Sequence, residues 1–197
     1  MIRIATEQDA ERLLEIYAYY IKNTAITYEY DVPSIEEFAA RIRRILKGYP
    51  YLVAEENGKI VGYAYASRFH ERKACDWAVE TAIYVDKDIK KKGIGKALYI
   101  ALEKALSYQN IISLNACIAK PLVEDEYLTM NSIHFHEHVG YRFAGEFYKC
   151  GYKFGRWYDL VWMEKFLMEH PDKPLAIKLF PEVREVFASE LADMNFV

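Results

Sequence analysis

Cysteine is scarce in this chain of 197 residues, and the three present, Cys75, Cys117 and Cys150, lie far apart. An odd number of cysteines without a C-x-x-C pair argues against a disulfide framework and against a zinc site. No segment approaches the roughly 20 consecutive apolar residues that a membrane-spanning helix requires. We therefore expect a cytoplasmic protein in a reducing compartment, with no membrane partner.

Positive charge is not in excess either, because 26 lysines and arginines stand against 29 acidic residues, which gives a net charge of −3. A dedicated nucleic-acid-binding domain normally carries clustered basic charge, so we expect no nucleic-acid partner. The hydrophobic share of 52% suits one globular domain with a sizeable core. Three of the six prolines fall near the end. We therefore expect a domain at residues 1–166 and a C-terminal extension at 167–197, with a possible helix from about Glu182.

Hydrophobic periodicity predicts alternating helices and strands. A strand from Trp77 to Val85, then a helix, then a strand at 111–118 imply a parallel crossover. Asn57-Gly58 predicts the two-residue turn of a hairpin. The resulting fold class is α/β or α+β, built on one mixed sheet. The other expected elements are a strand at 2–5, a helix from Thr6 to about Asn23, a helix opened by Ser34, a short helix at 132–139, and a final hairpin with strands at 141–149 and 157–165.

The stretch "AIYVDKDIKKKGIGKAL" places two glycines between the central strand and a helix. Backbone N–H groups at the start of such a helix lack partners and point to where an anion can bind. A G-x-G pair alone often serves only turn geometry. A Walker loop would need a hydroxyl residue after Lys96, where the chain has Ala97, and a dinucleotide fingerprint would need glycine at Leu98. Both nucleotide motifs are therefore excluded.

The segment from Lys90 to Gly95 resembles the pyrophosphate loop, [Q/R]-x-x-G-x-[G/A], of the GNAT superfamily of N-acetyltransferases. Four further stretches resemble its phosphinothricin N-acetyltransferase-like branch: "AITYEY", "CDWAVETAIYV", "SIHFHEHVGY" and "GYKFGRWYDLVWMEK". Together these stretches span most of residues 2–166. The resemblance implies a mostly antiparallel central sheet flanked by helices, and acetyl-CoA as cosubstrate without a metal.

The resemblance also implies how acetyl-CoA is held. The backbone amides of residues 92–97 would bind its pyrophosphate, and the edge of the central strand would bind its pantetheine arm. Lys90, at the first loop position, has the positive charge of an arginine but cannot form the two parallel hydrogen bonds of a guanidinium group. The other loop lysines either attract the 3′-phosphate or only keep the loop hydrated. The implied cofactor-binding residues are Ile83, Val85, Lys90, Lys91, Lys92, Gly93, Ile94, Gly95, Lys96 and Asn131.

Two residues are implied as catalytic. Glu80 matches the position of the branch's general base, which would take a proton from the attacking ammonium group; the alternative is a buried carboxylate paired with an arginine. His136 faces inward on its helix and could protonate the departing thiolate, or it could be a packed, hydrogen-bonded histidine. The "HFHEH" segment lacks H-E-x-x-H spacing, so we expect no metal there.

Implied substrate contacts are Tyr28, Arg72 and Trp77, with Lys153 or Arg156 as further candidates. The alternatives are core aromatic rings and solvated surface charges. Many relatives carry a basic residue where this chain has Asp76, which puts phosphinothricin itself in doubt as the substrate.

The predicted function is transfer of an acetyl group from acetyl-CoA to the amino group of a small amino-acid-like substrate, by direct attack in a ternary complex. Phosphinothricin, methionine sulfoximine, methionine sulfone and ordinary amino acids are the implied substrate types. The alternatives are a non-catalytic acyl-CoA-binding sensor and a protein N-terminal acetyltransferase, whose open peptide groove the "CGYKFGRWYD" loop would obstruct. A homodimer is possible.

Overall fold

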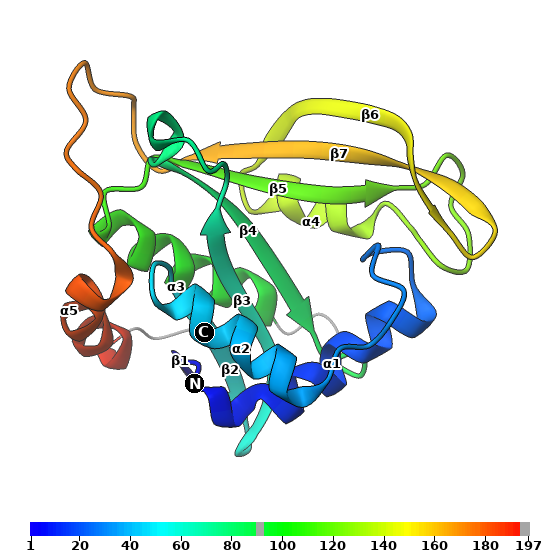
Figure 1. Cartoon of the computed structure of the whole chain (residues 1–197), viewed down its shortest axis with the longest axis horizontal. Coiled ribbons are helices and arrows are strands. Elements are labelled where there is room, and N and C mark those ends of the chain that lie inside the picture. The colour runs from blue at the N-terminus through cyan, green and yellow to red at the C-terminus, as the bar shows by residue number, and fades with distance from the viewer. Residues whose placement is uncertain (90–92, 194–197) are drawn as a thin grey trace.

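The computed structural model describes residues 1–89 and 93–193. Its centre is one seven-stranded sheet in the order β1-β2-β3-β4-β5-β7-β6 (Figure 1). Only β4 and β5 run parallel; every other neighbouring pair is antiparallel. The expected mixed, mostly antiparallel sheet with a parallel crossover is therefore confirmed. The strands are β1 Ile2–Ile4, β2 Tyr51–Glu56, β3 Lys59–Arg68, β4 Ala78–Val85, β5 Ser113–Lys120, β6 Arg142–Lys153 and β7 Arg156–Phe166.

Local capping chemistry fixes the helix starts. The Ser34 hydroxyl accepts a hydrogen bond from the Glu37 amide at 3.1 Å and opens the second helix. The capping box at Thr6 opens a 3₁₀ turn before the first α-helix, which ends at Asn23 as expected. The helical elements are η1 Glu7–Asp9, α1 Ala10–Asn23, α2 Ile35–Leu46, η2 Lys73–Cys75, α3 Ile94–Tyr108, α4 Asn131–His138 and α5 Phe180–Asp193.

Helices cover the two faces of the β1–β4 half of the sheet (Figure 1). On one face, α1 and α2 pack Leu13 and Ile42 against the side chain of Tyr63 and its neighbours. On the opposite face, α3 and α5 pack Leu102 and Phe187 into a second cluster. The alternation of side chains along each strand divides the residues between these clusters.

The parallel pair β4–β5 is short. Only Ala78–Glu80 pair with Ser113–Asn115, although β4 continues to Val85 and β5 to Lys120. Beyond these three pairs the two strands diverge (Figure 1), and β5 keeps its pairing with β7 as far as Lys120. We call the space between the diverging strands the gap.

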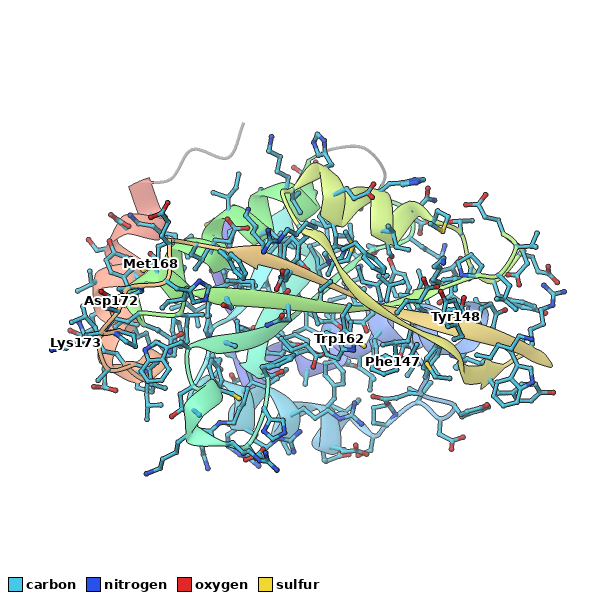
Figure 2. All side chains as sticks on the ribbon, turned by 90° about the horizontal axis from the view of Figure 1, so that it is seen from above. Phe147, Tyr148, Trp162, Met168, Asp172 and Lys173 are labelled. Carbon is cyan, nitrogen blue, oxygen red and sulfur yellow. The ribbon has the colours of Figure 1, made fainter. Side chains whose placement is uncertain are left out.

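The final hairpin is longer than predicted. Phe154 and Gly155, both with positive φ, form a two-residue turn, so the strands extend to Lys153 and from Arg156. The segment 150–156 is therefore mostly strand rather than loop. A bulge in β6 around Lys149 shifts the register, and the Lys149 amide donates to Asp159 Oδ1 at 2.8 Å. Figure 2 shows Phe147 and Tyr148, both exposed, on this outer strand.

The C-terminal extension is held against the domain. Trp77 Nε1 donates to the Leu175 carbonyl at 2.7 Å, and Asn110 Nδ2 donates to the Ala176 carbonyl at 2.7 Å. The extension ends in α5, which begins at Phe180, two residues before the expected start. No helix within the described residues is both long and apolar enough to cross a bilayer.

Gly151 in β6 leaves room for a tyrosine ring. A Cβ atom at this position would lie 2.2 Å from Tyr28 Cζ, whereas a Cβ at Gly145 in the same strand would meet nothing within 4 Å. We expect Gly151→Ala to lower the free energy of unfolding by about 1–3 kcal/mol. Gly145→Ala should change it by less than about 0.5 kcal/mol. Urea unfolding of both variants checks this, and equal stabilities would contradict the tight Tyr28 contact.

Candidate functional site

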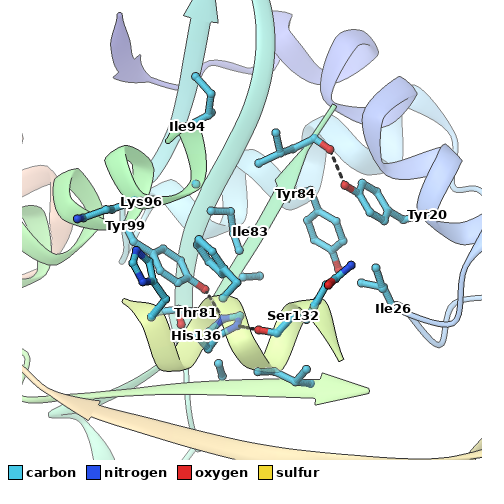
Figure 3. Close-up of a pocket in the computed structure, with 18 of the residues that line it drawn as sticks. Tyr20, Ile26, Thr81, Ile83, Tyr84, Ile94, Lys96, Tyr99, Ser132 and His136 are labelled. Carbon is cyan, nitrogen blue, oxygen red and sulfur yellow. Dashed lines mark hydrogen bonds between the residues drawn. The ribbon is translucent and has the colours of Figure 1, made fainter. Parts of the chain in front are cut away.

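A cavity of about 580 Å³ occupies the gap (Figure 3). Its walls come from β4 and β5, from the first turn of α3 and from α4, and Tyr20 and Ile26 reach it from α1 and the following loop. It exists because β4 leaves β5 after Glu80. Tyr65 of β3 also lines it, so the lining residues come from segments far apart in the sequence.

The start of α3 presents backbone donors to this cavity. Gly93 precedes the helix with a φ of +73°, a left-handed conformation that favours glycine. The first helical hydrogen bond runs from the Ala97 amide to the Gly93 carbonyl at 2.9 Å, so the amides of Ile94, Gly95 and Lys96 have no partner within the helix. These amides and the positive end of the helix dipole suit an anionic group.

The second glycine has a different role. A Cβ at Gly95 would lie 3.0 Å from the ring of Phe135, which also lines the cavity. Gly95 therefore allows α3 and α4 to approach each other at the mouth of the gap.

The edge of β4 that faces the gap has free backbone groups. The Asp86 amide donates to the Val61 carbonyl in β3, and antiparallel pairing alternates along the strand, so Ile83 and Val85 direct their backbone groups toward the gap. The Tyr20 hydroxyl donates to the Val85 carbonyl (Figure 3). The other backbone groups of these two residues are available to an extended ligand laid along the strand.

Glu80 is half-buried at the point where the gap opens. Its carboxylate makes no hydrogen bond or ion pair within the described part of the chain. Burial raises the pKa of Glu80 above the ordinary value for glutamate. The arginine partner expected for a purely structural carboxylate is therefore not among the described residues.

His136 lies on the wall of the cavity and is buried. Its Nδ1 lies 2.7 Å from the Ser132 carbonyl, and its Nε2 lies 2.9 Å from the Tyr99 hydroxyl (Figure 3). A carbonyl can only accept, so Nδ1 carries the proton, and burial lowers the pKa of the imidazole and favours its neutral form. Nε2 is then the acceptor of a hydrogen bond that the Tyr99 hydroxyl donates. Burial raises the pKa of Tyr99, which keeps that hydroxyl protonated.

Most of the predicted cofactor-binding residues line this one cavity: Ile83, Val85, Gly93, Ile94, Gly95, Lys96 and Asn131, together with Glu80 and His136. Lys90, Lys91 and Lys92 lie outside the described residues. The structure thus brings together side chains separated by more than fifty positions in the sequence.

The three predicted substrate residues do not line the cavity. The Tyr28 hydroxyl donates to the Asp159 carbonyl at 2.9 Å, next to the β6 bulge. Trp77 donates to the C-terminal extension, and Arg72 is exposed at the start of η2. The contacts of Tyr28 and Trp77 are those of structural side chains.

The two further candidates are also engaged elsewhere. Lys153 is buried and donates to the Thr24 and Thr27 carbonyls at 2.9 and 2.7 Å, which ties the hairpin to the loop after α1. Burial lowers the pKa of this lysine. Arg156 forms ion pairs with Asp125 and Glu126.

Two features were not predicted from the sequence: the position of Tyr99 on the cavity wall and a second cavity of about 520 Å³ under α2. Five tyrosines line that cavity, and Tyr65 and Tyr84 line both cavities. A signal was available, because Tyr63 and Tyr65 alternate on one strand and Arg41 and Arg44 are three apart on a helix. No group of three His, Cys, Asp or Glu residues able to hold a metal occurs at positions 1–89 or 93–193.

Comparison with known proteins places this site in a family. The acetyltransferase (GNAT) domain profile matches residues 2–162. A phosphinothricin N-acetyltransferase of Streptomyces viridochromogenes is 32% identical over 88% of this chain and 92% of its own length. An L-methionine sulfoximine/L-methionine sulfone acetyltransferase of Salmonella typhimurium is 32% identical over 86% of this chain and 95% of its own length.

Among solved structures, a phosphinothricin acetyltransferase from Sinorhizobium meliloti in complex with acetyl-CoA superposes with a TM-score of 0.79 and 33% identity. The match covers 91% of this chain and 97% of that one. The protein accordingly belongs to the GNAT family and is an acetyl-CoA-dependent N-acetyltransferase.

Proposed function

We propose that the enzyme acetylates the amino group of a small amino-acid-like acceptor by direct attack on acetyl-CoA in a ternary complex, with Glu80 as general base. The observation that carries the proposal is the unpaired, half-buried carboxylate of Glu80 at the gap. Relatives named for phosphinothricin and for methionine sulfone support the acceptor class.

The gap suits acetyl-CoA, which supplies an activated acetyl thioester. The unpartnered amides of Ile94, Gly95 and Lys96 fit a pyrophosphate, and the open backbone groups of Ile83 and Val85 fit an amide-containing arm. Lys96, exposed at the cavity, adds a cation on the solvent side, and Asn131 adds an amide at the start of α4.

Glu80 would take the proton from the acceptor's ammonium group, directly or through water, because only the neutral amine can attack a carbonyl carbon. Burial raises the pKa of Glu80, which makes it a stronger base than an exposed glutamate. Strand amides near Ile83 and Val85 would polarise the thioester carbonyl. Attack forms the amide bond and releases CoA as a thiolate.

The proton for that thiolate would come from the Tyr99 hydroxyl, which would rotate from His136 Nε2 toward the sulfur, and solvent would then return a proton to the Tyr99 oxygen. The resemblance offered His136 for this role, with a packed, hydrogen-bonded histidine as the alternative. Its Nε2 accepts from Tyr99, so in this tautomer it has no proton to give toward the cavity. His136 is better suited to orient the Tyr99 hydroxyl. A non-catalytic acyl-CoA sensor would need neither an unpaired base nor this oriented hydroxyl.

A substitution of Gly93 tests whether the backbone amides at the start of α3, which we call the cradle, bind acetyl-CoA. We expect Gly93→Val to raise the acetyl-CoA KM about tenfold or more, since a β-branched residue strains the left-handed conformation by roughly 1–2 kcal/mol and displaces the amides. Gly58, with a φ of +75° in the β2–β3 turn, is the matched control. Gly58→Val should destabilise the fold similarly and leave the acetyl-CoA KM unchanged; a raised KM in both variants would argue against the cradle.

A substitution of Glu80 tests its role as the general base. We expect Glu80→Gln to lower kcat by about 10²–10⁴-fold with an unchanged acetyl-CoA Kd in calorimetry. The wild-type rate should fall as the pH drops through the raised pKa of Glu80, so the acid limb of the kcat profile should have its midpoint above 4.5. The limb should be absent from the variant, and a variant with wild-type kcat at all pH values would remove Glu80 from the mechanism.

Tyr99 and Tyr141 form a matched pair, because both are buried and both pack against the His136 ring. Tyr99→Phe should lower kcat roughly 10–100-fold with little change in KM, since the proton donor is lost. Tyr141, whose hydroxyl bonds to Thr81, does not line the cavity, and Tyr141→Phe should change kcat less than about twofold. Steady-state kinetics of the two variants decide the assignment, and equal kcat losses would contradict it.

A further inference from the structure

One backbone group on the open edge of β4 already has a partner in the chain. Ile83 and Val85 direct their N–H groups and carbonyls toward the gap. The Val85 carbonyl accepts a hydrogen bond from the Tyr20 hydroxyl, whereas the other three groups have no hydrogen bond within residues 1–89 and 93–193. Tyr20 therefore occupies one of the positions at which an extended ligand would pair with this strand.

The Tyr20 side chain reaches this carbonyl from α1 and forms part of the cavity wall (Figure 3). Its ring is half-buried and meets the ring of Tyr84 edge-on, with centroids 5.3 Å apart. The Val85 carbonyl is the only hydrogen-bond partner of the hydroxyl in the described chain. Burial raises the pKa of Tyr20, so the hydroxyl keeps the proton that it donates.

The rest of α1 is anchored independently of this bond. Arg12, about two turns earlier on the helix, pairs with Asp86 and donates from Nε to the Ile60 carbonyl at 3.0 Å. Leu13 is buried in the core cluster under α1. Loss of the Tyr20 bond would therefore release one side chain and leave the helix in place.

The pantetheine arm of acetyl-CoA contains two amides, whose N–H groups need acceptors. A chain paired with a strand points its N–H groups directly at the carbonyls of that strand. The Tyr20 hydroxyl donates to the Val85 carbonyl from within the same cavity. The arm and Tyr20 therefore compete for one acceptor, and binding exchanges one hydrogen bond for another instead of adding one.

We propose that Tyr20 is a gate for the cosubstrate: its hydroxyl occupies the Val85 carbonyl until the pantetheine arm displaces it, and returns when CoA leaves. The gate rests on the placement of acetyl-CoA along β4 proposed above and adds a residue that weakens cosubstrate binding. It gives a partner to a carbonyl that would be costly to leave unpaired. Because acetyl-CoA and CoA carry the same arm, the gate lowers the affinity for both by the same factor.

Calorimetry of Tyr20→Phe tests the gate with acetyl-CoA, with CoA, and with ADP, which has a pyrophosphate but no pantetheine arm. The Kd of acetyl-CoA and that of CoA should both fall by the same factor, about threefold to tenfold, because the arm no longer has to displace a hydrogen bond. The Kd of ADP should be unchanged, which also shows that the variant is folded. Tyr19→Phe should bind all three ligands as wild type does. Tyr19 is the matched control, because it is adjacent on α1, does not line the cavity and makes no hydrogen bond through its hydroxyl within the described residues.

An unchanged or raised Kd of acetyl-CoA in Tyr20→Phe would overturn the gate. An equal effect of Tyr19→Phe, or an equal effect of Tyr20→Phe on ADP, would also overturn it, because the change would then not act through the arm. The measurement needs no amine substrate, so its outcome is independent of the role of Glu80. If Gly93→Val bound acetyl-CoA with the wild-type Kd, the placement of the cosubstrate would itself be refuted, and the gate with it.

Discussion

The separation of β4 from β5 after three paired residues is the constraint on which the site depends. Backbone groups left unpaired in a sheet interior carry a free-energy cost unless a ligand or water satisfies them. Side-chain hydrogen bonds form at the point where β4 and β5 diverge, which we call the fork. Thr81 Oγ1 donates to the Asn115 carbonyl at 3.2 Å and bonds to the Tyr141 hydroxyl at 2.9 Å. Asn115 Nδ2 donates to the Val79 carbonyl at 3.2 Å. These bonds stop the ladder from continuing and so keep the gap open.

The neighbouring strands and helices hold β4 and β5 in place on either side of the gap. β3 pairs with β4 from Val79 to Val85, and β7 pairs with the whole of β5, so each strand keeps a partner on the side away from the gap. α3 and α4 approach each other at the gap, where Gly95 lies against Phe135. Because both strands are fixed by pairing, a ligand would find the open strand edge already formed rather than having to create it.

Much of this architecture was predictable from local sequence signals. The Asn57-Gly58 turn, the Ser34 cap and the Gly93 loop each encode their geometry within a few residues, and the structure has these features where they were expected. The fork itself has no local signal, because it depends on how far two strands pair. Tyr28 and Trp77 were likewise ambiguous, since their contacts, Asp159 and Leu175, are distant in sequence and could not be inferred from spacing.

The unpaired state of Glu80 separates a functional carboxylate from a structural one. Elsewhere this chain pairs its partly buried carboxylates: Asp9 and Glu55 each lie 2.7 Å from Arg3, and Asp86 pairs with Arg12. Taking a charge out of water without a partner costs free energy, so a carboxylate kept only for the fold would be paired or replaced. Glu80 has neither an arginine nor a hydrogen bond within the described chain, and it lines the cavity in the gap. The partner that compensates its desolvation is then expected to come from outside the chain, and the ammonium group of an acceptor has the required charge.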